Sequence, residues 1–428
     1  MLLGSSLALG PTSSSGGADL LRSLFNRAGV AIAGRDGTLV QSGATGSTAL
    51  HPTTGAVASA GDLISHNLVL GGVGVLPMSF AQGARTNLLL NSVWSGAVGG
   101  SPGTAPTSWG ITTTGAPSTA VSGGTITFTV DGATARAFYT QTVSVSASTV
   151  YTLSVRIASL SNALAVSEVV LWNTFPAGAS TTYSINGVSV ANSVAVSAGD
   201  VVCTHLTVAA TPGTAIARVG AQTGGSLFVA TVMALKSPQV ESGSFRGLYI
   251  PTTSASLTRT ADNILWTPPA ALSTTSGEVV AIAAPYLWSA GAGAAGPHAA
   301  APRLFGLGSP AGGELSRDTV DSASHVDGGG TQLASAATLA ASSGVLSRWS
   351  MKFESTALRL YQNGALAASD ATVTNPWVAS TTLSVGDRAA YSRPWHGFVG
   401  LIYVPGGLTD AERSALARMT AGSLSYVG

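Results

Sequence analysis

Short β-forming runs separated by turn residues recur through most of the chain, and this pattern limits the possible folds more than any other feature. One series lies between about residues 120 and 262, and a second between about 277 and 404. Runs of this length and spacing are typical of antiparallel β-sandwiches. The sequence therefore predicts an all-β protein with two antiparallel β-sandwich domains. The runs are Thr125–Val130, Phe138–Val145, Thr149–Ile157, Glu168–Trp172, Val188–Val196, Val201–Val208, Ala215–Ala221, Leu227–Leu235, Glu278–Ala283, Arg303–Leu307, Ser347–Phe353, Ala357–Tyr361, Thr381–Val385 and Phe398–Val404.

Two local signals are sharper than the rest. Asn363-Gly364 separates two of the runs and is the strongest hairpin signal in the chain. Thr409, with Glu412 three residues later, forms a capping box that predicts a helix over Thr409–Met419. A weaker apolar stripe over Ala18–Phe25 fits either a helix or an irregular strand. Two stretches rich in Ala, Gly and Ser predict loops, and these are Gly291–Pro302 and Gly328–Gly344.

The composition excludes several classes of function. Only 9% of the residues are charged and the net charge is +1, whereas a typical soluble domain has about 25% charged residues. Such a weak field argues against a nucleic-acid groove or an anionic membrane surface as partner. The most apolar window, Val279–Ala301, is interrupted by Pro285 and Pro297, so we expect no membrane span. The single Cys203 excludes an internal disulfide, and its strand-like neighbours predict a buried, unreactive thiol.

Four motifs in a fixed order carry a family resemblance. They are Phe25–Ala28, Gly83–Ser92, Gln239–Phe245 with Tyr249–Thr253, and Thr258–Asp262. This set resembles a module of tailed-bacteriophage virion proteins, particularly tail fibres, head fibres and minor tail proteins. The stretch between these motifs resembles a carbohydrate-binding-module-like jelly roll.

A second set of motifs resembles the concanavalin-A-like, laminin-G-like lectin fold. Its members are Arg348-Trp349-Ser350, Leu358–Gly364, Phe398–Ile402 and Leu408–Glu412. The resemblance implies three parts: a virion-attachment and oligomerisation segment over residues 1–92, a jelly roll over 93–262, and a lectin-like sandwich over 263–428. The start lacks a coiled-coil or collagen-like shaft, which favours a compact spike or decoration over a long fibre.

The resemblance implies a structural protein of the virion surface that binds host-surface glycan. The alternatives are a capsid or tail decoration (cement) protein without a ligand, and a glycan-degrading tailspike. The Gly/Ser-rich start has few periodic apolar residues, so we expect a homo-oligomer, most simply a homotrimer, in contact with other virion proteins. We expect no enzyme activity, no cofactor, no nucleic-acid partner and no membrane insertion.

Aromatic residues beside Pro, Gly or Ser are the candidate sugar contacts, because sugar rings stack on aromatic faces while polar neighbours bind the hydroxyls. The densest cluster precedes the last predicted strand and contains Tyr391, Arg393, Trp395 and His396. Trp377 and Trp288 occupy similar loop contexts. Burial between sheets or subunits remains the alternative for this cluster. Four other tryptophans are predicted to lie in the core, and these are Trp94, Trp109, Trp172 and Trp349.

Other chemistry has weak signals only. Gly291–Gly296 matches a dinucleotide-binding glycine pattern, but Pro297 and Pro302 argue against the helix that such a site needs. His205 lies in a predicted strand, where a structural histidine is expected. Asp318, Asp321 and Asp327 fit either a solvated loop or a calcium site, and we predict no metal. A glycosidase needs two carboxylates across a cleft. Nothing in the sequence selects such a pair, although Glu168 with Glu241, or Glu278 with Glu354, are conceivable.

Overall fold

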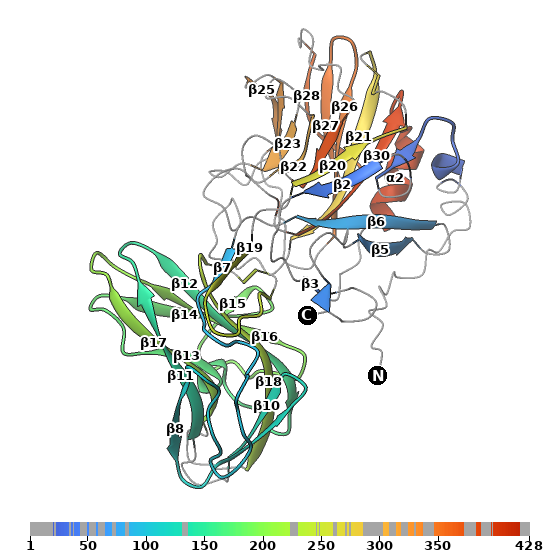
Figure 1. Cartoon of the computed structure of the whole chain (residues 1–428). Helices are drawn as coiled ribbons and strands as arrows, with labels where there is room; N and C mark the ends of the chain where they lie inside the picture. Colours follow the sequence, from blue (N-terminus) through green and yellow to red (C-terminus); the bar gives the residue numbers. More distant parts are fainter. Residues whose placement is uncertain are drawn as a thin grey trace.

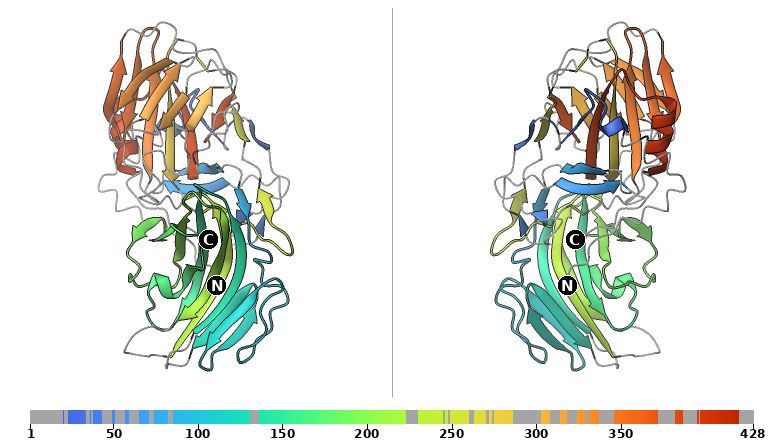
Figure 2. Two further views of the ribbon diagram at one scale, coloured as in Figure 1. Left: turned by 90° about the vertical axis from the view of Figure 1, so that its left-hand side faces the viewer. Right: turned by 90° about the vertical axis from the view of Figure 1, so that its right-hand side faces the viewer.

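The computed structural model shows two β-sandwich units, one above the other in Figures 1 and 2. The residues that it describes are 20, 23–33, 36, 38–42, 49–50, 57–58, 65–70, 74–81, 85–130, 136–222, 230–244, 246–247, 249–259, 263–269, 272–273, 275–285, 303–307, 314–317, 324–328, 331–336, 346–371, 382–386, 395 and 397–419. All paired strands in these residues run antiparallel, so the all-β prediction is confirmed. No helix in this part of the chain is long and apolar enough to cross a membrane.

The upper unit, here called the terminal sandwich, combines strands from both ends of the chain. Its eight-stranded sheet has the order β28-β27-β26-β21-β30-β6-β5, with β1 also paired to β30, and its seven-stranded sheet has the order β2-β20-β29-β22-β23-β24-β25. The first sheet consists of β1 (Ala31–Ile32), β5 (Ser65–Leu70), β6 (Gly74–Ala81), β21 (Gly277–Pro285), β26 (Ser347–Phe353), β27 (Leu358–Gln362), β28 (Ala365–Asp370) and β30 (Gly397–Pro405). The second consists of β2 (Thr38–Ser42), β20 (Asn263–Thr267), β29 (Leu383–Val385), β22 (Arg303–Leu307), β23 (Glu314–Arg317), β24 (Ser324–Gly328) and β25 (Thr331–Ala336).

The lower unit, here called the insert, spans residues 88–256. It packs a seven-stranded sheet, β15-β14-β16-β12-β18-β10-β9, against a four-stranded sheet, β13-β17-β11-β8. The larger sheet consists of β9 (Ser118–Ser122), β10 (Thr125–Val130), β12 (Val150–Leu160), β14 (Ser180–Ile185), β15 (Val188–Val190), β16 (Val201–Thr207) and β18 (Thr231–Ser242). The smaller one consists of β8 (Gly110–Thr114), β11 (Arg136–Val145), β13 (Val170–Asn173) and β17 (Gly213–Gln222), and the short helix η1 covers Val166–Glu168.

A short ribbon marks where the chain enters and leaves the insert. Strand β7 (Arg85–Asn87) pairs antiparallel with β19 (Leu257–Arg259), so entry and exit lie side by side. Before the ribbon, β1 and β6 pair with β30, and β2 pairs with β20. Parts of residues 31–81 therefore complete the terminal sandwich, in addition to the attachment role that we predict for residues 1–92. Another two-stranded pair, β3 (Ala49–Leu50) with β4 (Val57–Ala58), also lies before the ribbon.

The alternation of residue types explains both cores. In β10, Ile126, Phe128 and Val130 are fully buried and alternate with partly exposed threonines, as expected for a strand with one face on a core. Strand β21 is buried on both faces. Val279, Ala281 and Ala283 point between the two sheets, while Val280, Ile282 and Ala284 pack with residues of the helix α2 (Asp410–Met419).

Several local predictions can be compared with the structure directly. The capping box is confirmed, because Thr409 Oγ1 accepts from the Glu412 N–H at 3.2 Å and Glu412 accepts from the Thr409 N–H at 2.8 Å. The hairpin at Asn363-Gly364 is confirmed, with φ of 46° and 87°. Residues 23–25 are helical. The loop prediction over 328–344 is wrong for β25, whose backbone pairs with β24.

Candidate functional site

The predicted ligand-facing cluster has one described member, Trp395, and its side chain is fully buried (0% exposed). Its backbone N–H donates to the Gly386 carbonyl at 2.6 Å, and its ring meets the Trp349 ring edge-on with centroids 5.5 Å apart. Both rings belong to the core between the sheets of the terminal sandwich. The prediction that Trp395 contacts a ligand is therefore wrong. The other predicted contacts lie outside the described residues, and these are Tyr391, Arg393, His396, Trp377 and Trp288.

The structure also describes several other residues that the sequence analysis singled out. The four tryptophans assigned to the core are buried. Cys203 is buried, and burial raises the pKa of its thiol to about 11. Asp327 lies in β24 opposite Glu314, while Asp318 and Asp321 lie outside the described residues. Among the residues that the structure describes, no three His, Cys, Asp or Glu side chains are grouped so that they could hold a metal ion.

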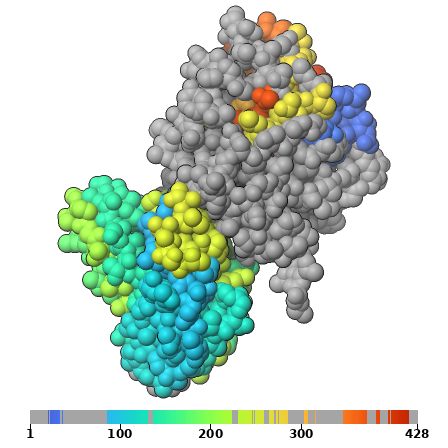
Figure 3. Space-filling view, in the orientation of Figure 1, coloured from blue at the N-terminus to red at the C-terminus, as the bar shows by residue number. Residues whose placement is uncertain are grey.

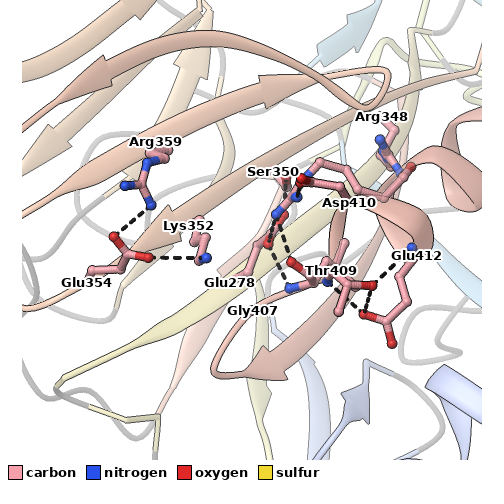
Figure 4. Close-up of polar contacts among 12 residues, drawn as sticks. Glu278, Arg348, Ser350, Lys352, Glu354, Arg359, Gly407, Thr409, Asp410 and Glu412 are labelled. Atoms are coloured by element: carbon pink, nitrogen blue, oxygen red, sulfur yellow. Dashed lines mark hydrogen bonds and ion pairs between the residues drawn. The ribbon is translucent and has the colours of Figure 1, made fainter.

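Three motifs of the second set, Arg348–Ser350, Leu358–Gly364 and Leu408–Glu412, meet in a buried polar cluster that fixes α2 to the eight-stranded sheet (Figure 4). Glu278 of β21 is 0% exposed and pairs with Arg413 of α2 at 2.6 Å. The same carboxylate accepts the Leu408 N–H at 3.0 Å and the Ser350 hydroxyl. The Arg413 guanidinium also lies 3.8 Å above the ring of Tyr361. Donors from β26, α2 and the segment before α2 thus converge on this one buried carboxylate.

A second buried arginine joins this cluster. Arg348 of β26 is 1% exposed and donates through Nη1 to the Arg413 carbonyl in α2. Burial lowers the pKa of Arg348 to about 10, with Glu278 acting in the opposite direction and Arg413 adding to the lowering. At the N-terminal end of α2, Arg27 bonds Glu412 at 3.1 Å and the Gly407 carbonyl at 3.0 Å. The motif Phe25–Ala28, which contains Arg27, thus contacts the same helix.

Two further motifs of the first set, Gly83–Ser92 and Gln239–Phe245 with Tyr249–Thr253, meet in a second buried cluster, here called the junction cluster, where the insert joins the ribbon. Asn87 (0% exposed) donates to the Ile250 carbonyl at 2.7 Å, and its oxygen accepts the N–H groups of Leu89 and Val240, each at 3.1 Å. Gln239 accepts the Ile250 N–H at 2.6 Å. Asn87 bonds the backbone of Val240 and Ile250, and Gln239 bonds that of Ile250, so these contacts tie the start of the insert to its end.

Two further contacts extend the junction cluster. Ser92 and Thr252 bond reciprocally, each N–H donating to the other hydroxyl at 2.9 Å. Glu241, 1% exposed, accepts the Gly247 N–H at 2.6 Å. Burial raises the pKa of Glu241, and Arg85 and the Gly247 N–H oppose this rise. Asn87, Ser92, Gln239, Glu241 and Thr252 are all buried and each makes at least one hydrogen bond within the cluster, so we assign the cluster to architecture. The motifs identified these residues in the sequence, but they did not predict that the residues hold the base of the insert together.

His205 is a structural histidine, as predicted. It is 5% exposed on β16, with Nδ1 2.8 Å from the Thr152 hydroxyl and Nε2 2.8 Å from the Ser184 hydroxyl. Thr152 donates its own proton to the Gly243 carbonyl at 2.7 Å. The histidine must therefore carry its proton on Nδ1 and accept at Nε2 from Ser184. Burial lowers the pKa of His205 to about 4, so the ring is neutral near pH 7.

The carboxylates considered for a glycosidase pair have structural partners. Glu278 and Glu241 belong to the clusters above. Glu168 accepts the Ala165 N–H at 2.7 Å as a helix cap. Glu354 pairs with Lys352 at 3.2 Å and Arg359 at 2.6 Å.

The open polar surface of the insert is the outer face of its four-stranded sheet, on the left in Figure 1. Ala137, Tyr139, Ala215 and Val219 of this sheet point into the core, so the alternate residues point outward. Six of the outward residues bear hydroxyls, and we call this surface the threonine face. They are Thr112, Thr114, Thr140, Thr142, Ser144 and Thr214, all partly or fully exposed.

Hydroxyl and aliphatic groups alternate on the threonine face. Ile216 and Leu171, both partly exposed, lie among the hydroxyls, with Ile216 directly opposite Thr142. The face therefore offers short-range hydrogen bonds and small apolar contacts, the two kinds of interaction that a sugar ring uses. Sequence reasoning missed this face because each threonine by itself is an ordinary outward strand residue.

No protein-family model matches the chain, and no curated protein matches it either. Among solved structures it is similar to domain 4 of AbnA, an extracellular arabinanase from Geobacillus stearothermophilus solved with arabinotriose. That match has 16% identity and a TM-score of 0.30, and covers 41% of this chain and 81% of the domain. The binding domain of Paraclostridial Mosquitocidal Protein 1 matches with 11% identity, a TM-score of 0.27, and 41% and 45% coverage. The receptor-binding domain of botulinum neurotoxin type G matches with 10% identity, a TM-score of 0.24, and 38% and 43% coverage. The chain thus spans less than half of either toxin domain.

Proposed function

We propose that this chain is a surface protein of a tailed-bacteriophage virion that holds its insert outward for attachment to host-surface glycan. The observation that carries the proposal is the ribbon β7–β19, which connects the insert to the terminal sandwich through adjacent entry and exit strands. Figure 3 shows the insert as a lobe of its own. An inserted unit of this kind can be displayed without disturbing the sandwich that carries it.

The threonine face supports glycan as the ligand. A nearly neutral protein has little long-range attraction to offer, so its contacts must be short-range hydrogen bonds and apolar contacts. One such site is weak, with a dissociation constant on the order of 1 mM. In this proposal the terminal sandwich faces other virion proteins, the protein is a homotrimer, and many copies per particle supply avidity. It acts by binding and has no enzyme activity.

The test removes the insert and keeps the terminal sandwich. Because Asn87 pairs directly with Leu257, residues 88–256 can be replaced by Asn-Gly, which turns the ribbon into a two-residue β-hairpin. We expect particles with this shortened chain to assemble normally and to adsorb to host cells at least tenfold less well. Unchanged adsorption would favour the decoration protein without a ligand. Release of oligosaccharides from host glycan by the full chain would favour the tailspike enzyme.

A further inference from the structure

The threonine face carries two arginines on neighbouring strands. Arg136 of β11 lies opposite Gln222 of β17, and Arg218 of β17 lies opposite Thr140 of β11. Both positions share the outward phase of the sheet, because directly opposed residues in an antiparallel pair point to the same side. Phe138 lies between the two arginines in the register, opposite Gly220, and is fully buried. Because Phe138 shares the outward phase and yet is fully buried, the face is covered at that point, and the two cations lie on either side of it.

Neither arginine is neutralised within the described residues. Arg136 Nε donates to the Thr114 hydroxyl at 2.9 Å, a neutral partner. The Nε of Arg218 is buried and has no hydrogen-bond partner in this part of the chain. Burial lowers the pKa of Arg218, and the nearby charge of Arg136 lowers it further. Arg27, Arg359 and Arg413 differ in this respect, since each bonds a carboxylate.

Two unneutralised guanidinium groups repel each other, and an anion bound beside them reduces that repulsion. Guanidinium groups also form forked hydrogen bonds that match planar carboxylates and fit sulfate oxygens. The neighbouring hydroxyls of Thr112, Thr140 and Thr142 donate to and accept from sugar hydroxyls equally well. The combination suits a sugar with one acidic substituent better than an inorganic anion, which would use the arginines alone.

We propose that Arg136 and Arg218 bind the anionic group of an acidic polysaccharide on the threonine face. This inference rests on the proposed glycan-binding function and narrows its ligand to sugars bearing a carboxylate or a sulfate. The rest of the sugar lies along the hydroxyls of β11 and β17.

The experiment measures binding of the purified full chain to three immobilised probes. These are polygalacturonate for carboxylate, dextran sulfate for sulfate, and dextran as the neutral sugar. Arg136→Gln and Arg218→Gln are compared with Arg418→Gln, a matched loss of one charge at an exposed position of α2. We expect each threonine-face variant to weaken binding to one acidic probe about tenfold, and Arg418→Gln to leave it unchanged. Raising NaCl from about 50 to about 300 mM should weaken wild-type binding by screening.

The binding measurements distinguish failure of this inference from failure of the proposed function. If Arg136→Gln/Arg218→Gln binds the acidic probes as wild type does, the inference is overturned. Equally tight, arginine-dependent binding of duplex DNA would overturn the assignment to sugar. If wild type binds neutral dextran or host glycan but neither acidic probe, the inference fails while the proposed function stands. If a Gln variant does not fold, Arg218→Lys keeps the charge without the fork, and full binding by that variant would contradict forked recognition.

Discussion

The buried pair of Glu278 and Arg413 makes the stability of the terminal sandwich predictable. We predict that Glu278→Gln lowers its free energy of unfolding by about 3–5 kcal/mol, the usual result of removing one partner of a buried ion pair. Both side chains are almost completely inaccessible (0% and 2%) and lie 2.6 Å apart. Unit charges about 4 Å apart attract by about 4 kcal/mol at an effective dielectric constant of about 20. The variant leaves Arg413 and Arg348 buried without this anion, and its amide nitrogen adds a donor where donors already crowd.

The matched control is Glu354→Gln in the same unit. Glu354 also faces two cations, Lys352 and Arg359, but all three side chains are partly exposed (19–35%). Exposed pairs of this kind contribute about 0–1 kcal/mol. Hydrogen exchange read by mass spectrometry, over a urea series, follows β21, β26 and α2 separately from the insert. We expect faster exchange in these three elements for Glu278→Gln only, with unchanged exchange in the insert.

A double variant tests whether the unpaired buried charge causes the loss of stability. Replacing both partners by apolar residues, as Glu278→Leu with Arg413→Met, removes the orphaned charge and should restore most of the lost stability. If Glu278→Gln proves no more damaging than Glu354→Gln, or if the double variant is as unstable as the sum of its parts, the buried pair is not what anchors α2.

Two further predictions concern the insert. The imidazole of His205 becomes protonated below about pH 6.5 in the unfolded chain but only below about pH 4 in the folded insert. Its contribution to the free energy of unfolding is therefore present at pH 7 and is lost, by up to about 3 kcal/mol, as the pH falls between these two values. Between pH 7 and 4.5 the urea midpoint of His205→Gln should shift less than that of wild type, and equal shifts would refute this. Residues 84–261 expressed alone should melt cooperatively, because the ribbon pairs the two ends of this segment. Residues 264–428 alone lack β1, β2 and β6 and should not fold, and a cooperative melt of 264–428 would show that these strands are dispensable.

Much of the strand content was readable from local pattern. The predicted runs Arg303–Leu307 and Ser347–Phe353 coincide with β22 and β26, because a continuous β-forming run bounded by turn residues needs no distant information. Val188–Val196 forms a strand only over its first three residues, since the rest turns back to a single bridge between Ala165 and Ala195. Strand β25 has the sequence Thr-Gln-Leu-Ala-Ser-Ala, which carries a weak local preference, and its pairing with β24 decides its conformation.

The long-range pairings had no local signal. Nothing in the composition of residues 31–81 indicates that Ile32 pairs with Ile402 or Leu39 with Trp266. The predicted boundary between residues 262 and 263 therefore divides the chain into continuous segments, whereas the terminal sandwich draws strands from both sides of the insert. The burial of Trp395 could have been predicted from the sequence. It has the same parity as Val399, Leu401 and Tyr403, which all face the core, so extending the alternation of β30 by two residues predicts burial.

The motifs that carried the resemblance explain architecture better than they explain recognition. Asn87, Gln239 and Glu241 bind backbone N–H or carbonyl groups inside the junction cluster, and Glu278 with Arg413 holds a helix to a sheet. Residues with such roles are restricted by the geometry of their partners, so they form recognisable patterns whatever the protein binds. The residues that we propose for recognition sit instead on outward strand positions, where a change of side chain costs the fold little. In a protein built this way, the junction can keep its motif while the exposed sheet face changes, and under the proposed function ligand specificity is to be sought on that face.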